Sequence, residues 1–187
     1  MYRIFRSAAL LTSLAAAACG GAVPVGPVLL TQDEVGGVYA ACSMEFRPTG
    51  LASVDLLLAA TEQNPAPPLP VPNLKLSRQV PSFELEYTPR GDVLPVRLTG
   101  TYVLGASTVR LEFAASPSAL ESALLLTNSV PLSFSREPTE LTIASPRYSV
   151  ARQEYGRLAG LSQDEMRNLQ DRIEGTLTGR FARGPCS

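Results

Sequence analysis

The middle of the chain alternates apolar and polar residues with a period of two, and this pattern constrains the fold more than any other feature. Charged or hydroxyl-bearing residues occupy most of the alternate positions. Successive side chains of a strand point to opposite faces, so each run predicts a strand with one buried face. The apolar positions are Phe83, Leu85 and Tyr87, then Val96, Leu98, Tyr102 and Leu104, then Val109, Leu111 and Phe113.

Short turn sequences separate these runs. Residues 89–92 read Pro-Arg-Gly-Asp, and residues 105–107 read Gly-Ala-Ser. Connections this short join antiparallel neighbours, because parallel strands need long crossovers. The sequence therefore predicts a mainly β fold of about eight strands, either an antiparallel up-and-down β-barrel or a strongly curved sheet, with a two-sheet sandwich as a third option. Further strands are predicted around residues 38–46, 54–58, 132–134, 141–143 and 177–181.

The first of these strands has its own alternating face. That face holds Val38, Ala40, Cys42, Met44 and Phe46, which fall at every second position. The strand predicted at 54–58 alternates in the same way. We expect both faces to point into the core.

One C-terminal helix is predicted. Ser162 and Glu165 have the spacing of a capping box, and Met166, Leu169 and Ile173 then form one apolar stripe over about three turns. This amphipathic helix is expected to pack against the sheet.

Residues 116–128 fit two structures. Ser118 and Glu121 are spaced as a second capping box, which favours a helix, whereas Leu124–Leu126 also suits a strand. The pattern leaves both open.

The N-terminus has the order of charge and hydropathy found in export signals. Arg3 and Arg6 precede an uncharged apolar stretch, Ala8–Ala18, which is too short to span a bilayer as a helix. The stretch ends in Ala-Ala-Ala-Cys-Gly-Gly, so small residues surround Cys19. This segment resembles the lipobox of bacterial lipoprotein precursors, in which the cysteine is acylated and becomes the first residue of the mature protein. The alternative is an ordinary secretory signal cut at an Ala-x-Ala site, which leaves Cys19 a free thiol.

The resemblance implies a division of the chain and a location. Residues 1–18 would be the signal peptide, residues 19–33 the lipidated cysteine with a flexible tether, and residues 34–187 a single β-rich domain. Acylation, for example with palmitate, would hold that domain on a membrane. The expected location is the cell envelope outside the cytoplasm, at the outer membrane or cell surface.

Charge and composition exclude several functions. Without Arg3 and Arg6, 14 basic and 17 acidic side chains remain, a net charge of −3 that is too weak to indicate nucleic acid as a partner. The chain has no histidine, which removes Ser-His-Asp catalysis and His-ligated zinc. Asp55, Glu45 and Glu154 form no spaced constellation with a nucleophile or metal ligands. We therefore expect no enzyme, no catalytic residues, no cofactor and no metal site, and a carboxylate-based hydrolase is the weakest alternative.

The signal segment also bears on the other cysteines. If Cys19 carries lipid, Cys42 and Cys186 remain as a pair near the two ends of the domain, in a compartment that favours disulfides. A disulfide is therefore expected, and two unpaired thiols are the alternative.

A short motif suggests how the sheet closes. Gly37-Val38-Tyr39 opens the first predicted strand, and this Gly-x-aromatic element resembles the one that opens the first strand of lipocalins and related β-barrels. In that group the last strand pairs back to the first, which would bring Cys42 and Cys186 together. An open curved sheet that holds the C-terminal helix in its concave face, as in periplasmic lipid carriers, is the competing architecture.

Two functions remain. In one, the barrel is a structural or interaction module that contacts other envelope proteins, through the Pro-rich loop at residues 64–73 or the segment Arg147–Arg157. In the other, the barrel resembles a lipocalin in function and carries a hydrophobic small molecule. The residues expected to line that ligand site, which equally suit a filled core, are Phe83, Leu85, Tyr87, Tyr102, Leu111, Phe113 and Phe134.

Overall fold

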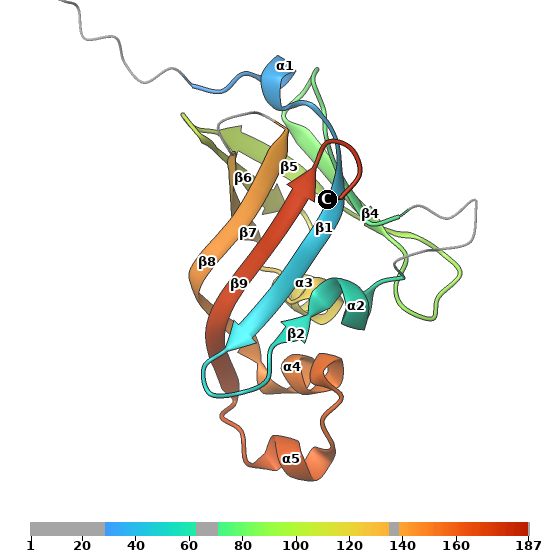
Figure 1. Ribbon diagram of the computed structural model, residues 1–187, viewed down its shortest axis with the longest axis vertical. Helices are drawn as coiled ribbons and strands as arrows, with labels where there is room; N and C mark the ends of the chain where they lie inside the picture. The colour runs from blue at the N-terminus through green and yellow to red at the C-terminus, as the bar shows by residue number, and fades with distance from the viewer. Residues whose placement is uncertain (1–28, 63–70, 135–138, 187) are drawn as a thin grey trace, which may run out of the picture.

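The computed structural model describes residues 29–62, 71–134 and 139–186 and shows one sheet with short helices at its two ends (Figure 1). Cys19, the predicted signal peptide and most of the Pro-rich loop at residues 64–73 lie outside these residues. In chain order the elements are α1 (Gln32–Val35), β1 (Gly37–Pro48), β2 (Val54–Asp55), α2 (Leu56–Ala60), β3 (Asn73–Leu76), β4 (Ser82–Tyr87), β5 (Val96–Leu104), β6 (Thr108–Phe113), α3 (Pro117–Leu124), β7 (Ser129–Phe134), β8 (Glu140–Ala151), α4 (Arg152–Ala159), α5 (Gln163–Arg167) and β9 (Arg172–Ala182).

The sheet closes on itself. Its strand order is β2-β1-β3-β4-β5-β6-β7-β8-β9, and β1 also pairs with β9 from Ala40 opposite Ala182 to Pro48 opposite Gly175. All pairs are antiparallel, so β1 and β3 to β9 form an eight-stranded up-and-down barrel, with β2 as an extra strand on the lower part of β1. This confirms the predicted barrel, and closure through β1 and β9 decides against the open sheet.

Most of the alternating faces are confirmed, but the prediction for β1 is wrong in its first half. Tyr39 and Met44 point into the barrel, whereas Val38 is 58% exposed. The register between β1 and β9 shifts between Ala41 and Ser43, so Cys42 is an extra residue in a β-bulge. Such a bulge reverses which positions face inward, and a strict period of two cannot foresee it.

The predicted strand at 54–58 is mostly a helix. Only Val54 and Asp55 pair with β1, and Asp55 then caps α2 by accepting a hydrogen bond from the Leu58 amide at 3.0 Å. Strand β3, in which Leu74 and Leu76 face the core, was not predicted. This strand is only four residues long and follows a Pro-rich segment, so its alternation is brief.

The C-terminal helix is shorter than predicted. The Ser162–Glu165 capping box forms, but α5 ends at Arg167 after five residues, and none of them is buried. Ile173 belongs to β9 instead, where it faces the core. A second helix that was not predicted, α4, precedes α5 and buries Tyr155 and Gly156.

Residues 116–128 form a helix followed by a turn. Ser116, rather than Ser118, caps α3 by accepting a hydrogen bond from the Ala119 amide at 3.3 Å. The helix stops at Leu125, which adopts the left-handed conformation with φ 52° and is fully buried. A non-glycine residue in this region is strained, so the surrounding packing must hold it there.

The barrel has two ends of different construction (Figure 1). We call the end covered by α1 the α1 end, and the end where α2, α3 and α4 gather the helical end. The end of the predicted tether contacts the domain, because Leu30 packs on the core and its amide donates a hydrogen bond to the Gly105 carbonyl at the α1 end. Within the described residues, no helix has the length and apolar character needed to cross a bilayer.

Candidate functional site

The barrel interior is the first candidate site, because the side chains expected to line a ligand all point into it. Six of the seven are buried, with 3–7% of their surface exposed, and the seventh is half-buried. The six are Phe83, Leu85, Tyr87, Tyr102, Leu111 and Phe113, and the seventh is Phe134.

These interior side chains pack against one another. The Phe83 and Phe113 rings meet edge to face with their centroids 4.8 Å apart. The centroid of the Phe134 ring lies 6.5 Å from that of the Tyr39 ring. A single cluster of buried hydrophobic side chains runs from Val35 at the α1 end to Tyr155 at the helical end. An eight-stranded barrel is just wide enough for side chains to fill it. The predicted ligand residues therefore make up a packed core.

The α1 end is closed by a plug built on the Gly-x-aromatic motif. Tyr39 is fully buried, and its hydroxyl donates to the Val35 carbonyl at 2.6 Å. The guanidinium of Arg183, which follows β9, lies 5.0 Å from the centre of the Tyr39 ring. Arg183 also donates to the carbonyls of Glu34 and Gly36, at 2.5 and 3.1 Å. Side chains from both ends of the domain thus hold α1 over the barrel.

Gly37 leaves room for this arginine. A Cβ atom at Gly37 would lie 3.1 Å from the Arg183 Nε atom, which is closer than ordinary packing allows. The motif therefore has a packing role here, in which its glycine admits the cation that covers its tyrosine.

Cys42 and Cys186 form a disulfide beside the α1 end. Their Sγ atoms are 2.04 Å apart and their Cα atoms 5.2 Å apart, over a separation of 144 residues. The bridge links β1 to the segment that follows β9. Strands β1 and β9 are the two that close the barrel. The pairing expected from the sequence is present in the structure.

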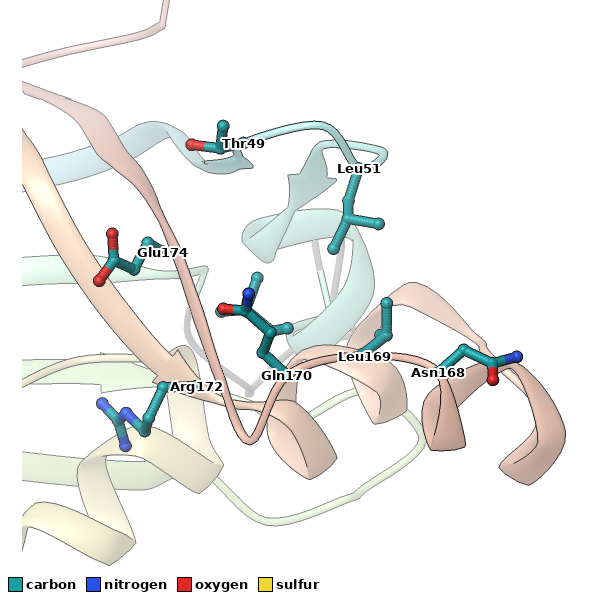
Figure 2. Close-up of a pocket in the computed structure, with 8 residues that line it drawn as sticks. Thr49, Leu51, Asn168, Leu169, Gln170, Arg172 and Glu174 are labelled. Carbon is teal, nitrogen blue, oxygen red and sulfur yellow. The ribbon is translucent and has the colours of Figure 1, made fainter.

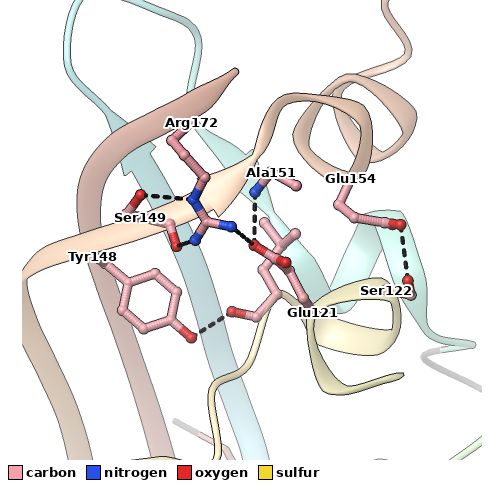
Figure 3. A network of polar contacts seen from close by, with 8 residues as sticks. Glu121, Ser122, Tyr148, Ser149, Ala151, Glu154 and Arg172 are labelled. Carbon is pink, nitrogen blue, oxygen red and sulfur yellow. Dashed lines mark hydrogen bonds and ion pairs between the residues drawn. The ribbon is translucent and has the colours of Figure 1, made fainter. Parts of the chain in front are cut away.

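A carboxylate and an arginine join the elements of the helical end (Figure 3). Glu121 on α3 accepts a hydrogen bond from the Ala151 amide at 2.6 Å and forms an ion pair with Arg172 at 3.1 Å. Arg172, at the start of β9, also donates to the Ser149 hydroxyl at 3.1 Å and to the Ser149 carbonyl. One ion pair thus connects α3 with the β8–α4 junction and β9.

Two further contacts attach α3 to its neighbours (Figure 3). Glu154 on α4 accepts a hydrogen bond from the Ser122 hydroxyl at 2.8 Å and pairs with Arg157 at 3.1 Å. The Tyr148 hydroxyl donates to the carbonyl of the strained Leu125. Burial raises the pKa of Tyr148 to about 12, so this phenol keeps its proton well above the usual range.

The carboxylates considered for acid–base chemistry have structural partners. Glu45 and Asp55 lie directly opposite each other on β1 and β2. Arg47 is 2.6 Å from Glu45, and its hydrogen bond lowers the pKa of that carboxyl group, while Asp55 caps α2. Glu154 pairs with Arg157 at 3.1 Å. Among the described residues, no three His, Cys, Asp or Glu side chains come close enough together to hold a metal ion.

Surface hollows lie around the helical end. One of about 380 Å³ opens between the β1–β2 loop and the start of β9, lined by Thr49, Leu51 and Leu169 with the polar side chains of Arg172 and Glu174 (Figure 2). Its wall is mixed and shallow. Leu169 was predicted as part of an apolar helical stripe, whereas Thr49, Leu51, Arg172 and Glu174 belong to no sequence motif and were not predicted as site residues.

A second hollow at this end is more apolar. It has a volume of about 440 Å³ and is lined mainly by residues of α2, α3 and the ends of β4 and β5. Close to it, the β4–β5 loop exposes Val93 and Leu94, at 78% and 73%, and α2 exposes 60% of Leu58. Arg90 connects the β4–β5 loop to α2, because its side chain donates a hydrogen bond to the Leu58 carbonyl at 2.9 Å. We call Leu58, Val93 and Leu94 the distal patch.

No protein-family model matches this chain, and neither the curated proteins nor the solved structures include a significant match. The functional argument therefore depends on the residues and the geometry described above.

Proposed function

We propose that this protein is a lipid-anchored module of the bacterial cell envelope, in which a rigid, filled barrel acts as a structural or interaction domain. The observation that carries the proposal is the packed interior. A carrier needs an enclosed void lined by apolar groups. Here six of the seven side chains that would line it belong to the buried hydrophobic cluster and Phe134 packs against it, the Phe83 and Phe113 rings are in contact, and short helices lie at both ends of the barrel.

Export is supported by two independent features of the chain. The N-terminal segment resembles a lipoprotein signal that ends at Cys19. The Cys42–Cys186 disulfide suits an oxidising compartment, where such bonds form and persist. Together they favour a domain held at a membrane, outside the cytoplasm.

The interaction role is supported by the surface of the helical end. Its distal patch of Leu58, Val93 and Leu94 is exposed beside the apolar hollow. Within the segment Arg147–Arg157, Arg147 lines another hollow, whereas Arg152 and Arg157 already pair with Asp171 and Glu154. The apolar patch is therefore a better candidate for contact with an envelope protein than the arginines.

The anchoring half of the proposal is tested by mass spectrometry of full-length protein from the membrane fraction of a bacterial host. We expect a mature chain that begins at an acylated Cys19. We expect the Cys19→Ala variant to carry no acyl chains and to be lost from the membrane fraction. Lys75→Ala, a change on the outer face of β3, is the matched control and should remain acylated. An unmodified Cys19 in the wild-type protein would contradict the anchor.

The module half is tested by the same preparation. Organic extraction of the purified protein should release no stoichiometric hydrophobic compound, because the acyl chains on Cys19 are covalently attached and stay with the protein. A compound recovered at one molecule per chain would overturn the filled barrel and favour the carrier.

A further inference from the structure

The α1 end carries an arc of exposed apolar side chains. These are Leu29 before α1, Val38 on β1, Val80 in the β3–β4 turn and Val103 near the end of β5, and 45–58% of their surface is exposed. Single exposed apolar residues are common, but a group on one edge indicates a contact surface. We call these four residues the α1 rim.

Backbone hydrogen bonds bring the parts of the α1 rim together. The Tyr102 amide, next to Val103, donates to the Pro81 carbonyl, next to Val80, at 3.0 Å. The Leu30 amide donates to the Gly105 carbonyl at the end of the same β5 hairpin, also at 3.0 Å. The start of the described chain, the β3–β4 turn and the end of β5 therefore form one edge.

The position of Cys19 in the sequence favours this edge as the one nearest a membrane. Nine residues lie between Cys19 and Leu29, so the anchor lies at most about 35 Å from the rim. The 11 residues of β9, tilted as in a typical barrel, give a height of about 28 Å. Reaching the bilayer with the helical end would therefore need an almost fully stretched connection.

The charges around the α1 rim do not favour one sign of partner. Lys75 lies opposite Val38 and Arg110 lies opposite Val103, while Asp33 and Glu34 are exposed on α1. A polyanionic or polycationic surface would meet repulsion as well as attraction here. An apolar layer bordered by polar headgroups suits an apolar edge with mixed charges.

We propose that the α1 rim rests in the surface of the bilayer that holds Cys19, so that the barrel stands on its α1 end with the distal patch facing away. This orientation depends on the proposed lipid anchor. Beyond the anchor, the orientation specifies that the α1 end meets the lipid and that the helical end is presented to a partner.

Spin labels at the two ends test the orientation. The lipidated full-length protein is prepared as Val80→Cys and, as the matched control, Val93→Cys, and is reconstituted into phosphatidylcholine vesicles. Both valines are more than half exposed, so neither change disturbs the core. Cys42 and Cys186 are bonded and Cys19 is acylated, so only the new thiol takes the nitroxide. Its accessibility to oxygen and to a water-soluble nickel chelate is then measured.

We expect the ratio of oxygen to nickel accessibility at residue 80 to rise several-fold on reconstitution, while residue 93 keeps its value in solution. Adding 30% anionic lipid should leave both ratios unchanged within about twofold, since the contact is apolar. Equal ratios at the two sites, or a larger rise at residue 93, would overturn the orientation. Flotation of the vesicles separates the two failures. If the protein floats with the vesicles but residue 80 stays exposed to water, only the orientation is wrong. If the protein does not float, the lipid anchor is wrong as well.

Discussion

The two ends of the barrel are closed in different ways. At the α1 end a four-residue helix is held by Arg183, Tyr39 and a disulfide, so the closure depends on residues from the two ends of the domain. At the helical end, α2 and α3 bury leucines and α4 buries Tyr155, and polar contacts join α3 to α4 and to the end of β8. The contacts of Arg183 and the disulfide at the α1 end span 144–149 residues, whereas the hydrogen bonds of Glu121 and Glu154 at the helical end span 30 and 32. The α1 end should therefore be the more sensitive to single changes.

The largest expected effect is loss of the disulfide. The double variant Cys42→Ser and Cys186→Ser removes a bridge over 144 residues, and the chain-entropy model predicts a loss of about 5 kcal/mol in the free energy of unfolding. Urea unfolding of the two proteins, each under non-reducing conditions, measures the difference. The control is wild-type protein after reduction, which should unfold at the same urea concentration as the double variant. A loss below about 1 kcal/mol would show that the α1 end does not depend on this bridge.

A matched pair of arginines compares the ends directly. Arg183→Met should lower the free energy of unfolding by about 2–3 kcal/mol. The change removes the cation from the Tyr39 ring and leaves the carbonyls of Glu34 and Gly36 without this donor. Arg172→Met should lower the free energy of unfolding by less than about 1 kcal/mol, because that side chain is 54% exposed and Glu121 still accepts the hydrogen bond from the Ala151 amide. The same urea experiment measures both. Equal losses would mean that the ends are equally robust.

The sequence predicted the barrel because its evidence is local and repeated. The runs at 83–87 and 109–113 alternate without interruption, and β4 and β6 form there with the predicted faces inward. Closure was predicted from Gly37-Val38-Tyr39 through a resemblance, and β1 does pair with β9. The disulfide followed from counting cysteines. Each of these features is either local in the sequence or fixed by a small number of candidates.

What the sequence did not predict depends on contacts between distant segments. The bulge at Cys42 is defined against β9, and Ile173 continues the apolar stripe of α5 yet extends into a strand because β8 is there to pair with it. The arginine over Tyr39 is 144 residues away from it in the chain, and no local pattern around Arg183 marks it. The distal patch and the α1 rim are likewise assembled from separate loops. Surfaces of this kind appear only once the fold is known.

A smaller effect at neutral pH than that of Arg183→Met is expected at Tyr148, and its pH dependence distinguishes the two ends by their electrostatics. Tyr148→Phe leaves the Leu125 carbonyl without its donor, which should cost about 1 kcal/mol at pH 7. Burial raises the pKa of Tyr148 from 10 to about 12, so the unfolded chain loses this proton first as the pH rises. The contribution of this ionisation to the free energy of unfolding is therefore unchanged below pH 10 and falls between pH 10 and about 12, by about 3 kcal/mol.

Urea unfolding at pH 9 to 12 should therefore show a shallower alkaline loss for Tyr148→Phe than for the wild type. Tyr39→Phe at the α1 end is the matched control. Burial also raises the pKa of Tyr39, but the nearby guanidinium of Arg183 acts in the opposite direction by favouring the phenolate. We expect Tyr39→Phe to change the alkaline slope less than Tyr148→Phe does. A larger change from Tyr39→Phe would show that the arginine at the α1 end packs against the ring without lowering its pKa, and the electrostatic contrast between the two ends would then be lost.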